Sequence, residues 1–290
     1  MNLVNIYTAL ITPFDQDEQI DYTAFTKLLK KQYEAGIRGF LISGTSGESP
    51  VLNFEEKKSL VMLAKSLYRD ISIMLGVGGN DTKKSLAEIE AFNAMEEIDA
   101  YLCVAPYYNR PSQKGLYEHF MALDQATVKP MILYNVPKRC GIEIEPITIV
   151  SLLVDSKHIV GLKHASDRLE TLTIVKQMVP EAILFAGDDH ALYESLYHGA
   201  DGVISVVSHL IPHSIMQMVE QFDLLPNLEP LDDYIKMIAK YCFIESSPSP
   251  VKYLLSKQGL IQNVLRLPLV PLSQENQEIL DLLLENDVFH

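Results

Sequence analysis

The sequence of 290 residues is poor in cysteine, and its three cysteines lie far apart in the chain. No two of them form a Cys-x-x-Cys pair, so the sequence predicts neither a disulfide framework nor a zinc knuckle. Cys103 falls in an apolar segment and is expected in the core. Cys140 follows Arg139 in a segment expected to be an accessible loop, but no histidine lies close in sequence to activate its thiol. Cysteine chemistry is therefore not expected to carry the function.

Basic residues are also scarce, with 24 lysines and arginines against 38 acidic residues and a formal net charge of −14. The sequence contains no lysine- and arginine-rich cluster of the kind that neutralises phosphate backbones, so nucleic acid is not expected as a partner. A negative surface also repels anionic substrates. A carboxylate substrate would therefore need specific cationic side chains to capture it locally.

Long apolar runs are missing as well. No stretch approaches the roughly 18 consecutive apolar residues that would indicate a membrane span. Residues 1–6 show no basic region or cleavage-like segment, so no secretory signal is expected. Hydrophobic residues make up 48% of the chain, which is enough to bury a substantial core. These features predict a soluble cytoplasmic protein.

Short apolar runs alternate with amphipathic stretches along most of the chain. The apolar runs predict strands at 5–11, 38–43, 72–77, 99–105, 130–134, 158–162, 182–186 and 202–207. The amphipathic stretches predict helices at 21–35, 54–68, 82–97, 114–126, 145–154, 168–178 and 189–198. Continuous apolar strands that alternate with helices are typical of a parallel sheet buried on both faces. Eight such units in about 220 residues predict the α/β class and a (β/α)8 TIM barrel.

A doubly wound open sheet is the competing architecture. It would usually bring a glycine-rich phosphate turn after the first strand, and Thr12-Pro13-Phe14 is no such turn. Beyond about residue 225, further helical stretches are predicted at 229–243, 249–258 and 273–286. The chain is therefore expected to divide into a catalytic barrel at 1–224 and a C-terminal helical extension at 225–290.

Lys163 stands at the end of the apolar run 158–162. Burial strips the water shell from an ammonium, and the usual response is a lowered pKa. A lysine that is neutral near pH 7 is a nucleophile able to condense with a carbonyl. The alternative is a structural lysine whose charged end reaches solvent.

Polar residues follow several predicted strands, and in a barrel such residues collect at one face. The second strand is followed by Gly44-Thr45-Ser46-Gly47-Glu48-Ser49, whose hydroxyls and backbone N–H groups suit a carboxylate, unless they cap the helix predicted at 54–68. The fifth strand ends at Tyr134, and Arg139 is placed to hold a carboxylate bidentately, or is a solvated surface arginine. The remaining strand ends carry Tyr107, Tyr108, Gly187, Asp188, Asp189 and Gly202–Ser205.

Two other barrel chemistries do not fit these residues. A metallohydrolase would want a His-x-His near the end of the first strand, where the sequence has Ile11-Thr12-Pro13. His209 and His213 are interpreted as flanking the start of a helix rather than as a metal pair. A sugar-phosphate barrel would want a glycine-rich phosphate site after the seventh and eighth strands, and Asp188-Asp189 has the wrong charge. We expect no metal and an unphosphorylated substrate.

Taken together, the motifs resemble the dihydrodipicolinate synthase family, which belongs to the class I pyruvate aldolases together with N-acetylneuraminate lyase. The resemblance runs from Ala9 to Pro268 and is carried by six segments: 44–49, 106–113, 134–139, 161–163, 186–189 and 202–206. It implies condensation of pyruvate with L-aspartate 4-semialdehyde on the diaminopimelate route to lysine, without a metal or organic cofactor. It also implies a homotetramer built as a dimer of dimers.

The resemblance further implies a role for each matching residue. Lys163 would form the Schiff base with pyruvate, and Tyr134 would be the general acid/base. Thr45 would link Tyr134 to Tyr108, which would come from a neighbouring subunit. Four further roles concern binding: Thr45 and Ser46 would hold the pyruvate carboxylate, Arg139 would hold the carboxylate of the aldehyde substrate, Ile204 would form the pocket wall, and Gly187 would be substrate-binding.

Two alternatives stay open at this point, namely a lyase for N-acetylneuraminate or another 2-keto acid, and a catalytically silent paralogue that binds a keto acid. Arg139 favours the synthase, since the sialate lyases lack it. The retention of Lys163, Tyr134, Thr45 and Tyr108 disfavours a silent paralogue.

The chain also departs from the family pattern at several positions. Ser46 stands where threonine is common, His164 where glutamate is usual, and His209 where asparagine is frequent. The lysine-feedback site keeps Asn80 and Tyr107, but its usual histidine and glutamate partners are replaced. The residues that replace them are Phe54, Lys57 and Lys84. Because added lysines would repel a lysine ammonium, we expect weak feedback inhibition.

Overall fold

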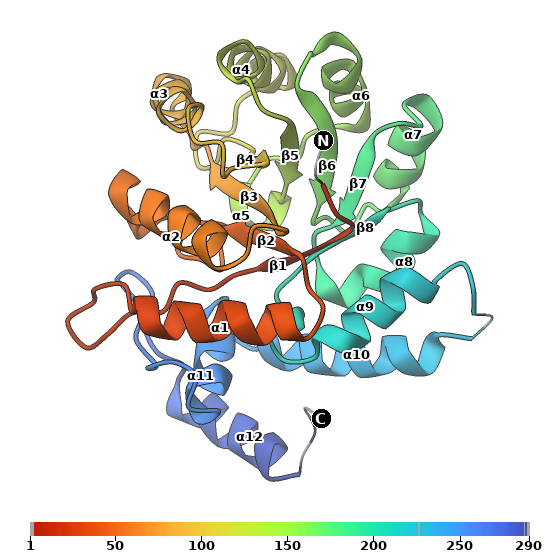
Figure 1. Cartoon of the computed structure of the whole chain (residues 1–290). Helices are drawn as coiled ribbons and strands as arrows, with labels where there is room; N and C mark the ends of the chain where they lie inside the picture. The colour runs from red at the N-terminus through yellow and green to blue at the C-terminus, as the bar shows by residue number, and fades with distance from the viewer. Residues whose placement is uncertain (1–2, 226, 287, 289–290) are drawn as a thin grey trace. The chain divides into compact units, whose positions relative to one another are not determined.

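The computed structural model describes residues 3–225, 227–286 and 288, and its centre is a barrel of parallel strands. The strands follow one another around the closed barrel in sequence order (Figure 1). They are β1 (Ile6–Ala9), β2 (Gly39–Ile42), β3 (Ser72–Val77), β4 (Ala100–Val104), β5 (Met131–Asn135), β6 (Ile159–His164), β7 (Ile183–Ala186) and β8 (Gly202–Ser205). Each strand overlaps one of the predicted apolar runs, although β5 and β6 extend one and two residues beyond theirs, and the predicted (β/α)8 TIM barrel is confirmed.

Helices follow the strands in alternation. They are α1 (Tyr22–Glu34), α2 (Phe54–Leu67), α3 (Thr82–Phe92), α4 (Gln113–Ala126), α5 (Pro137–Cys140), α6 (Pro146–Asp155), α7 (Glu170–Met178), α8 (Leu192–Tyr197), α9 (Pro212–Gln221), α10 (Glu229–Cys242), α11 (Ser249–Lys257) and α12 (Gln274–Glu285). The last three confirm the predicted C-terminal helices. The helix predicted at 82–97 stops earlier, at Phe92, and the start predicted between His209 and His213 is that of α9.

Tertiary contacts divide the chain into two compact units. The first combines the residues up to Asn5 with Ser72–Ile204, and the second combines Ile6–Ile71 with the residues from Ser205 onward. This is not the predicted division at residue 225, which separates a catalytic barrel from an extension and stays a prediction. Residues 226, 287, 289 and 290 of that extension lie outside the described residues.

In the first unit, strands β3 to β6 are buried along almost their whole length, as expected for strands covered on both faces. The register of the sheet pairs Tyr134 on β5 with Lys163 on β6, and Lys163 with Phe185 on β7. Tyr134 and Lys163 are therefore neighbours on adjacent strands. Helices α4, α6 and α7 pack side by side in this unit.

In the second unit, α10 contacts both α9 and α11. Helix α11 is buried on nearly all sides, because Val251, Leu254 and Leu255 all have no exposed surface. Helix α2 begins with a capping box, in which Asn53 accepts from the Glu56 N–H and Glu56 accepts from the Asn53 N–H. The hydroxyls of Gly44–Ser49 are therefore not the cap of this helix.

The prediction of an accessible loop at Cys140 is wrong. Cys140 is buried at the end of α5, and its Sγ donates a hydrogen bond to the Ala105 carbonyl at 3.2 Å. Pro137 begins this short helix and Gly141, with a φ of 70°, ends it. Burial raises the pKa of the Cys140 thiol to about 11. Cys103 lies in the core as predicted.

None of the helices formed by the described residues has the length and apolar character that crossing a bilayer requires.

Candidate active site

Lys163 is a buried lysine inside a strand. Its side chain lies in β6 with only 6% of its surface exposed, so the alternative of a lysine that reaches solvent does not hold. Its Nζ lies 4.4 Å from the centroid of the Tyr134 ring. Across the described residues, this ammonium forms no hydrogen bond and no ion pair with a carboxylate. An aromatic face stabilises a cation less than a carboxylate does, so little holds the proton in place.

The pKa of Lys163 reflects these surroundings. Burial is the largest influence and lowers the pKa to about 8, while the nearby charge of Arg139 lowers it further. The negative charges of Asp189 and Asp188 act in the opposite direction and raise it. With a pKa near 8, roughly 10% of the lysine is neutral at pH 7, against roughly 0.03% for an ordinary lysine. The predicted loss of proton affinity at this position is therefore supported.

Tyr134 provides the neighbouring phenol. It is 7% exposed and sits next to Lys163 through the pairing of β5 with β6. A phenol beside an amine that must gain and lose a proton is chemically suited to general acid/base work. The structure therefore brings together two of the four predicted catalytic residues.

Asp188 and Asp189 follow β7 and supply the negative charge near Lys163. Asp188 accepts hydrogen bonds from the backbone N–H of His190 at 3.1 Å and from its ring at 3.2 Å. These bonds, and chiefly the one to the His190 side chain, lower the pKa of the Asp188 carboxyl. Asp189 is buried. The sequence indicated only that these carboxylates exclude a phosphate. Their effect on Lys163 could not be inferred without the fold.

Gly187, predicted to bind substrate, also has a steric reason to be glycine. A Cβ at this position would lie 2.8 Å from the carbonyl of His164 and 2.8 Å from the Cβ of Ala165. The Gly187 N–H donates to the His164 carbonyl at 2.8 Å. Gly161, two residues before Lys163, is tighter still, because a Cβ there would collide with the Ile183 carbonyl oxygen. Both glycines let β6 and β7 approach closely around the lysine.

Arg139 and Tyr108 are the exposed members of the predicted site. Arg139 lies on α5 just after β5, and its charge reaches Lys163. Tyr108 is 88% exposed and has a φ of 74°, a region that non-glycine residues rarely adopt. Tyr108 therefore does not pack against the part of the protein that the structure describes. Ile204 on β8 is buried, as a pocket wall would be.

Thr45 and Ser46 belong to the second unit and follow β2. Ser46 is buried, and its Oγ lies 3.1 Å from the Oγ of Ser247. Thr45 is half-buried. The Gly47 carbonyl of the same loop accepts a hydrogen bond from the Thr12 hydroxyl at 2.7 Å. The two hydroxyls are thus presented by a loop that is fixed by contacts on both sides.

Two histidines depart from the family pattern, His164 and His209, and both form hydrogen bonds with the backbone. His164 is buried and its Nε2 lies 3.0 Å from the Arg168 carbonyl, while burial lowers its pKa. Adjacent strand residues point to opposite faces, so His164 faces away from Lys163. His209 accepts from the Ile11 N–H at 3.3 Å and donates to the Val206 carbonyl at 2.8 Å. Burial lowers the pKa of His209 to about 4, so this histidine is a neutral connection between backbone segments.

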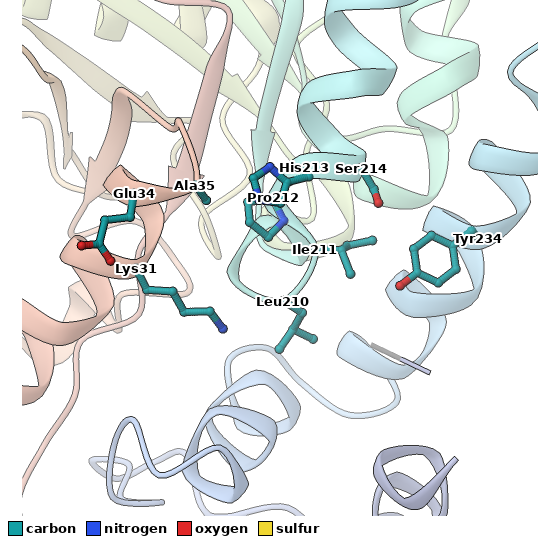
Figure 2. A pocket seen from close by; sticks show the side chains of 9 residues that line it. All are labelled: Lys31, Glu34, Ala35, Leu210, Ile211, Pro212, His213, Ser214 and Tyr234. Atoms are coloured by element: carbon teal, nitrogen blue, oxygen red, sulfur yellow. The ribbon is translucent and has the colours of Figure 1, made fainter. Parts of the chain in front are cut away.

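The second unit also contains an open pocket of about 530 Å³ (Figure 2). Its lining residues are Lys31, Glu34, Ala35, Leu210, Ile211, Pro212, His213, Ser214 and Tyr234. None of the predicted site residues lines it. Over residues 3–225, 227–286 and 288, no group of three or more His, Cys, Asp or Glu side chains is arranged to hold a metal ion.

Comparison with known proteins agrees with this geometry. A sequence model of the dihydrodipicolinate synthetase family matches residues 2–287. The 4-hydroxy-tetrahydrodipicolinate synthase of Fervidobacterium nodosum is 37% identical over 279 residues, with 94% of each chain covered. The solved dihydrodipicolinate synthase of Thermotoga maritima superposes with a TM-score of 0.93 at 32% identity, covering 99% of this chain and 100% of the other. A monomeric dihydrodipicolinate synthase variant superposes with a TM-score of 0.94 at 32% identity, covering 100% and 98%.

Proposed function

The chain belongs to the dihydrodipicolinate synthetase family, and from this membership we propose how its residues carry out the reaction. The reaction condenses pyruvate with L-aspartate 4-semialdehyde to give 4-hydroxy-tetrahydrodipicolinate, a lyase step of lysine and diaminopimelate biosynthesis. The observation that carries the proposal is the buried Lys163, whose pKa is lowered to about 8 beside the ring of Tyr134.

Lys163 is the nucleophile. The lone pair of its neutral amine adds to the keto carbon of pyruvate, and loss of water gives an iminium. The iminium withdraws electrons from the adjacent methyl group, which loses a proton to give an enamine. The enamine carbon then attacks the aldehyde, and the aldehyde oxygen takes up a proton to become a hydroxyl. The amino group of the aldehyde substrate finally attacks the iminium carbon, which closes the ring and releases the Lys163 amine. Each step therefore moves a proton close to the lysine.

Tyr134 carries these protons. A phenol in a relay of hydroxyls can give one proton and receive another without leaving a charge stranded in a buried site. Thr45 is the next hydroxyl of the relay, and Tyr108 of a neighbouring subunit connects it to solvent. The support for Tyr108 is its exposure of 88% together with its strained backbone, which a partner surface would explain.

The substrate carboxylates need cations and N–H or O–H donors in a protein with a net charge of −14. Thr45 and Ser46 hold the pyruvate carboxylate through their hydroxyls and the N–H groups of their loop. Arg139 holds the carboxylate of the aldehyde substrate, since an exposed guanidinium can pair bidentately with it. Ile204 forms the apolar wall, and Gly187 leaves room for substrate at the end of β7.

The assembly proposed for the chain is a homotetramer, a dimer of dimers, in the cytoplasm. The exposed Tyr108 supports at least a dimer. The three cysteines form no disulfide, as is usual for cytosolic proteins. Sedimentation of the unmutated chain tests the assembly, and a fully active monomer would contradict it.

Lysine inhibition is proposed to be weak, and strong inhibition at micromolar lysine would contradict that.

Reductive trapping tests the chemistry directly. Borohydride added with pyruvate should attach one reduced pyruvate to Lys163, which peptide mass spectrometry locates. A chain that gains no adduct would contradict the Schiff-base mechanism. An assay with L-aspartate 4-semialdehyde against N-acetylneuraminate then fixes the second substrate, and only the former is expected to be used.

A further inference from the structure

The Gly44–Ser49 loop, which presents Thr45 and Ser46, has strained backbone on either side of these residues. Ser43 has a φ of 58° and Glu48 a φ of 56°, and neither is glycine. Non-glycine residues persist in this region only when their surroundings impose it. Gly47 between them has little room for a side chain, because a Cβ would lie 3.0 Å from the Leu10 carbonyl oxygen. Backbone hydrogen bonds inside the loop, from Gly47 and Ser49 to the Gly44 carbonyl, hold part of this shape, and contacts from outside the loop add to them.

One of these contacts is an ion pair buried in the second unit. The Nζ of Lys252, on α11, donates to Glu48 Oε1 at 2.5 Å, and the two side chains are 0% and 1% exposed. The same ammonium donates to the Val264 carbonyl at 2.8 Å. The other oxygen of Glu48 accepts the Arg266 backbone N–H at 3.1 Å. Both charges are thus satisfied by groups fixed in the fold.

Two further residues of the C-terminal segment reach the same loop. The Ser247 hydroxyl lies 3.1 Å from that of Ser46, and both residues are buried. The Arg266 guanidinium donates to the Val51 carbonyl at 2.9 Å and to Glu56 at 2.6 Å. The loop is therefore held at Ser46, at Glu48 and just beyond its end, in each case by a residue that follows position 225.

We propose that Lys252 and Ser247 are positioning residues for pyruvate, which fix the Gly44–Ser49 loop so that Thr45 and Ser46 face the substrate carboxylate. This inference rests on the proposed function, because it deepens the role given there to the two hydroxyls. It makes the C-terminal helix α11 part of the catalytic apparatus. Neither residue touches substrate, and both act through the loop.

The alternative is that the pair only stabilises the fold. A buried ion pair is a poor stabiliser, since well-packed apolar side chains commonly replace it without loss. Its directional bonds do something that apolar packing cannot, because they select one backbone conformation at Glu48. A change in that conformation would turn the N–H and O–H groups of Thr45 and Ser46 away from the carboxylate. The expected effect is therefore weaker capture of pyruvate, with the chemistry at Lys163 retained.

The test uses the full-length chain carrying Lys252→Met, which keeps the length of the side chain and removes its charge. Borohydride trapping at increasing pyruvate gives the concentration at which half of Lys163 is labelled. We expect this concentration to rise about 10-fold or more, with complete labelling at saturation. The KM for pyruvate should rise in parallel while kcat falls less than about threefold. Lys257→Met is the matched control, because Lys257 lies on the same helix in an exposed pair with Asp281. It should leave the labelling curve unchanged.

Two further variants decide the matter if Lys252→Met does not fold. The double variant Glu48→Gln/Lys252→Met removes both buried charges, and Ser247→Ala removes only the hydroxyl next to Ser46. Both should raise the half-labelling concentration, Ser247→Ala by about threefold. Folded variants with an unchanged labelling curve would overturn the inference and leave the proposed function standing. Absence of labelling in the unmutated chain would instead overturn the proposed function, and this inference with it.

Discussion

Two buried lysines, one in each unit, show that burial alone does not make a lysine reactive. Burial lowers the pKa of Lys163 to about 8, and it also lowers the pKa of Lys252, where the Glu48 carboxylate acts in the opposite direction. Lys252 places its ammonium 2.5 Å from the Glu48 carboxylate, whereas Lys163 places its ammonium 4.4 Å from the centre of a phenol ring. The group nearest to the ammonium therefore determines whether a buried lysine stays charged or can lose its proton.

The difference follows from what deprotonation would leave behind. If Lys252 lost its proton, Glu48 would remain as a buried carboxylate without a countercharge, which is strongly unfavourable. If Lys163 loses its proton, the carboxylates nearby are Asp188, which is bonded to His190, and Asp189. Lys252 is therefore a fixed cation, and Lys163 is an amine that can react.

The largest expected effect separates the two lysines by activity. Lys163→Ala removes the proposed nucleophile, so kcat/KM should fall by at least about 10⁴-fold and reductive labelling with pyruvate should disappear. The labelling is read by peptide mass spectrometry and the rate by a coupled assay. Lys252→Met should keep a complete, though weaker, labelling curve. A Lys163→Ala chain that is still labelled or active would break the comparison.

The next effect concerns the phenol that Lys163 faces and Lys252 lacks. Tyr134→Phe keeps the ring beside the ammonium but removes the proposed proton carrier, so kcat should fall about 10²- to 10³-fold. The pyruvate adduct should still form when incubation is long. Tyr101→Phe is a control at another buried tyrosine of the same unit and should change kcat little. Equal losses in both variants would mean that Tyr134 acts only through packing.

The pH dependence of imine formation sharpens the difference further. Only the neutral amine reacts, so the rate at low pyruvate should rise about tenfold per pH unit below pH 8 and level off above it. Rapid quenching with borohydride measures the rate. Asp188→Asn removes a charge that raises the pKa of Lys163, so the midpoint should move to lower pH. A midpoint near 10.5 would show that Lys163 is an ordinary lysine.

The smallest effect is on thermal stability, and its sign should differ between the lysines. A pKa lowered from 10.5 to about 8 means that the charged form of Lys163 destabilises the fold by up to about 3 kcal/mol below pH 8. This penalty fades as the pH rises toward 10.5, because the unfolded chain then still binds the proton that the folded chain has lost.

Lys163→Met should therefore raise the melting temperature at pH 7 by a few degrees. Lys252→Met should lower it, because Glu48 is left unpaired at a cost of about 3–5 kcal/mol. Differential scanning calorimetry at pH 7 and pH 9 measures both. Shifts of the same sign would contradict the distinction between a reactive amine and a fixed cation.

Much of the fold could be predicted from the sequence because continuous apolar runs of strand length are a local signal. The run before Lys163 predicted β6, and the polar residues after the runs predicted which residues would share a barrel face. Short turns were harder to predict. Helix α5 has four residues, so it has no periodicity to detect, and Cys140 at its end was wrongly predicted to be accessible. The early end of α3 at Phe92 was missed for a different reason. The residues that follow Phe92 are still compatible with a helix, so the sequence gives no stop signal there.

Lys163 and Tyr134 could be singled out from the sequence because each ends an apolar run, and the structure places them side by side. The sequence could not show what supports that chemistry from a distance in the chain. Lys252 lies 204 residues after Glu48, and nothing local to either residue indicates the other. A lysine among Val251, Tyr253 and Leu254 was a possible signal, because a charge inside an apolar helix needs a partner.

Gly161 limits how this scaffold can be re-engineered. Since a methyl group there would collide with the Ile183 carbonyl oxygen, the strand that carries Lys163 cannot take a larger side chain at this position. Gly187 imposes a similar limit on the neighbouring strand end. A directed-evolution library that seeks new aldehyde acceptors should therefore keep both glycines. It should place its diversity at Arg139 and the exposed residues beside it, where changes in volume meet solvent rather than backbone.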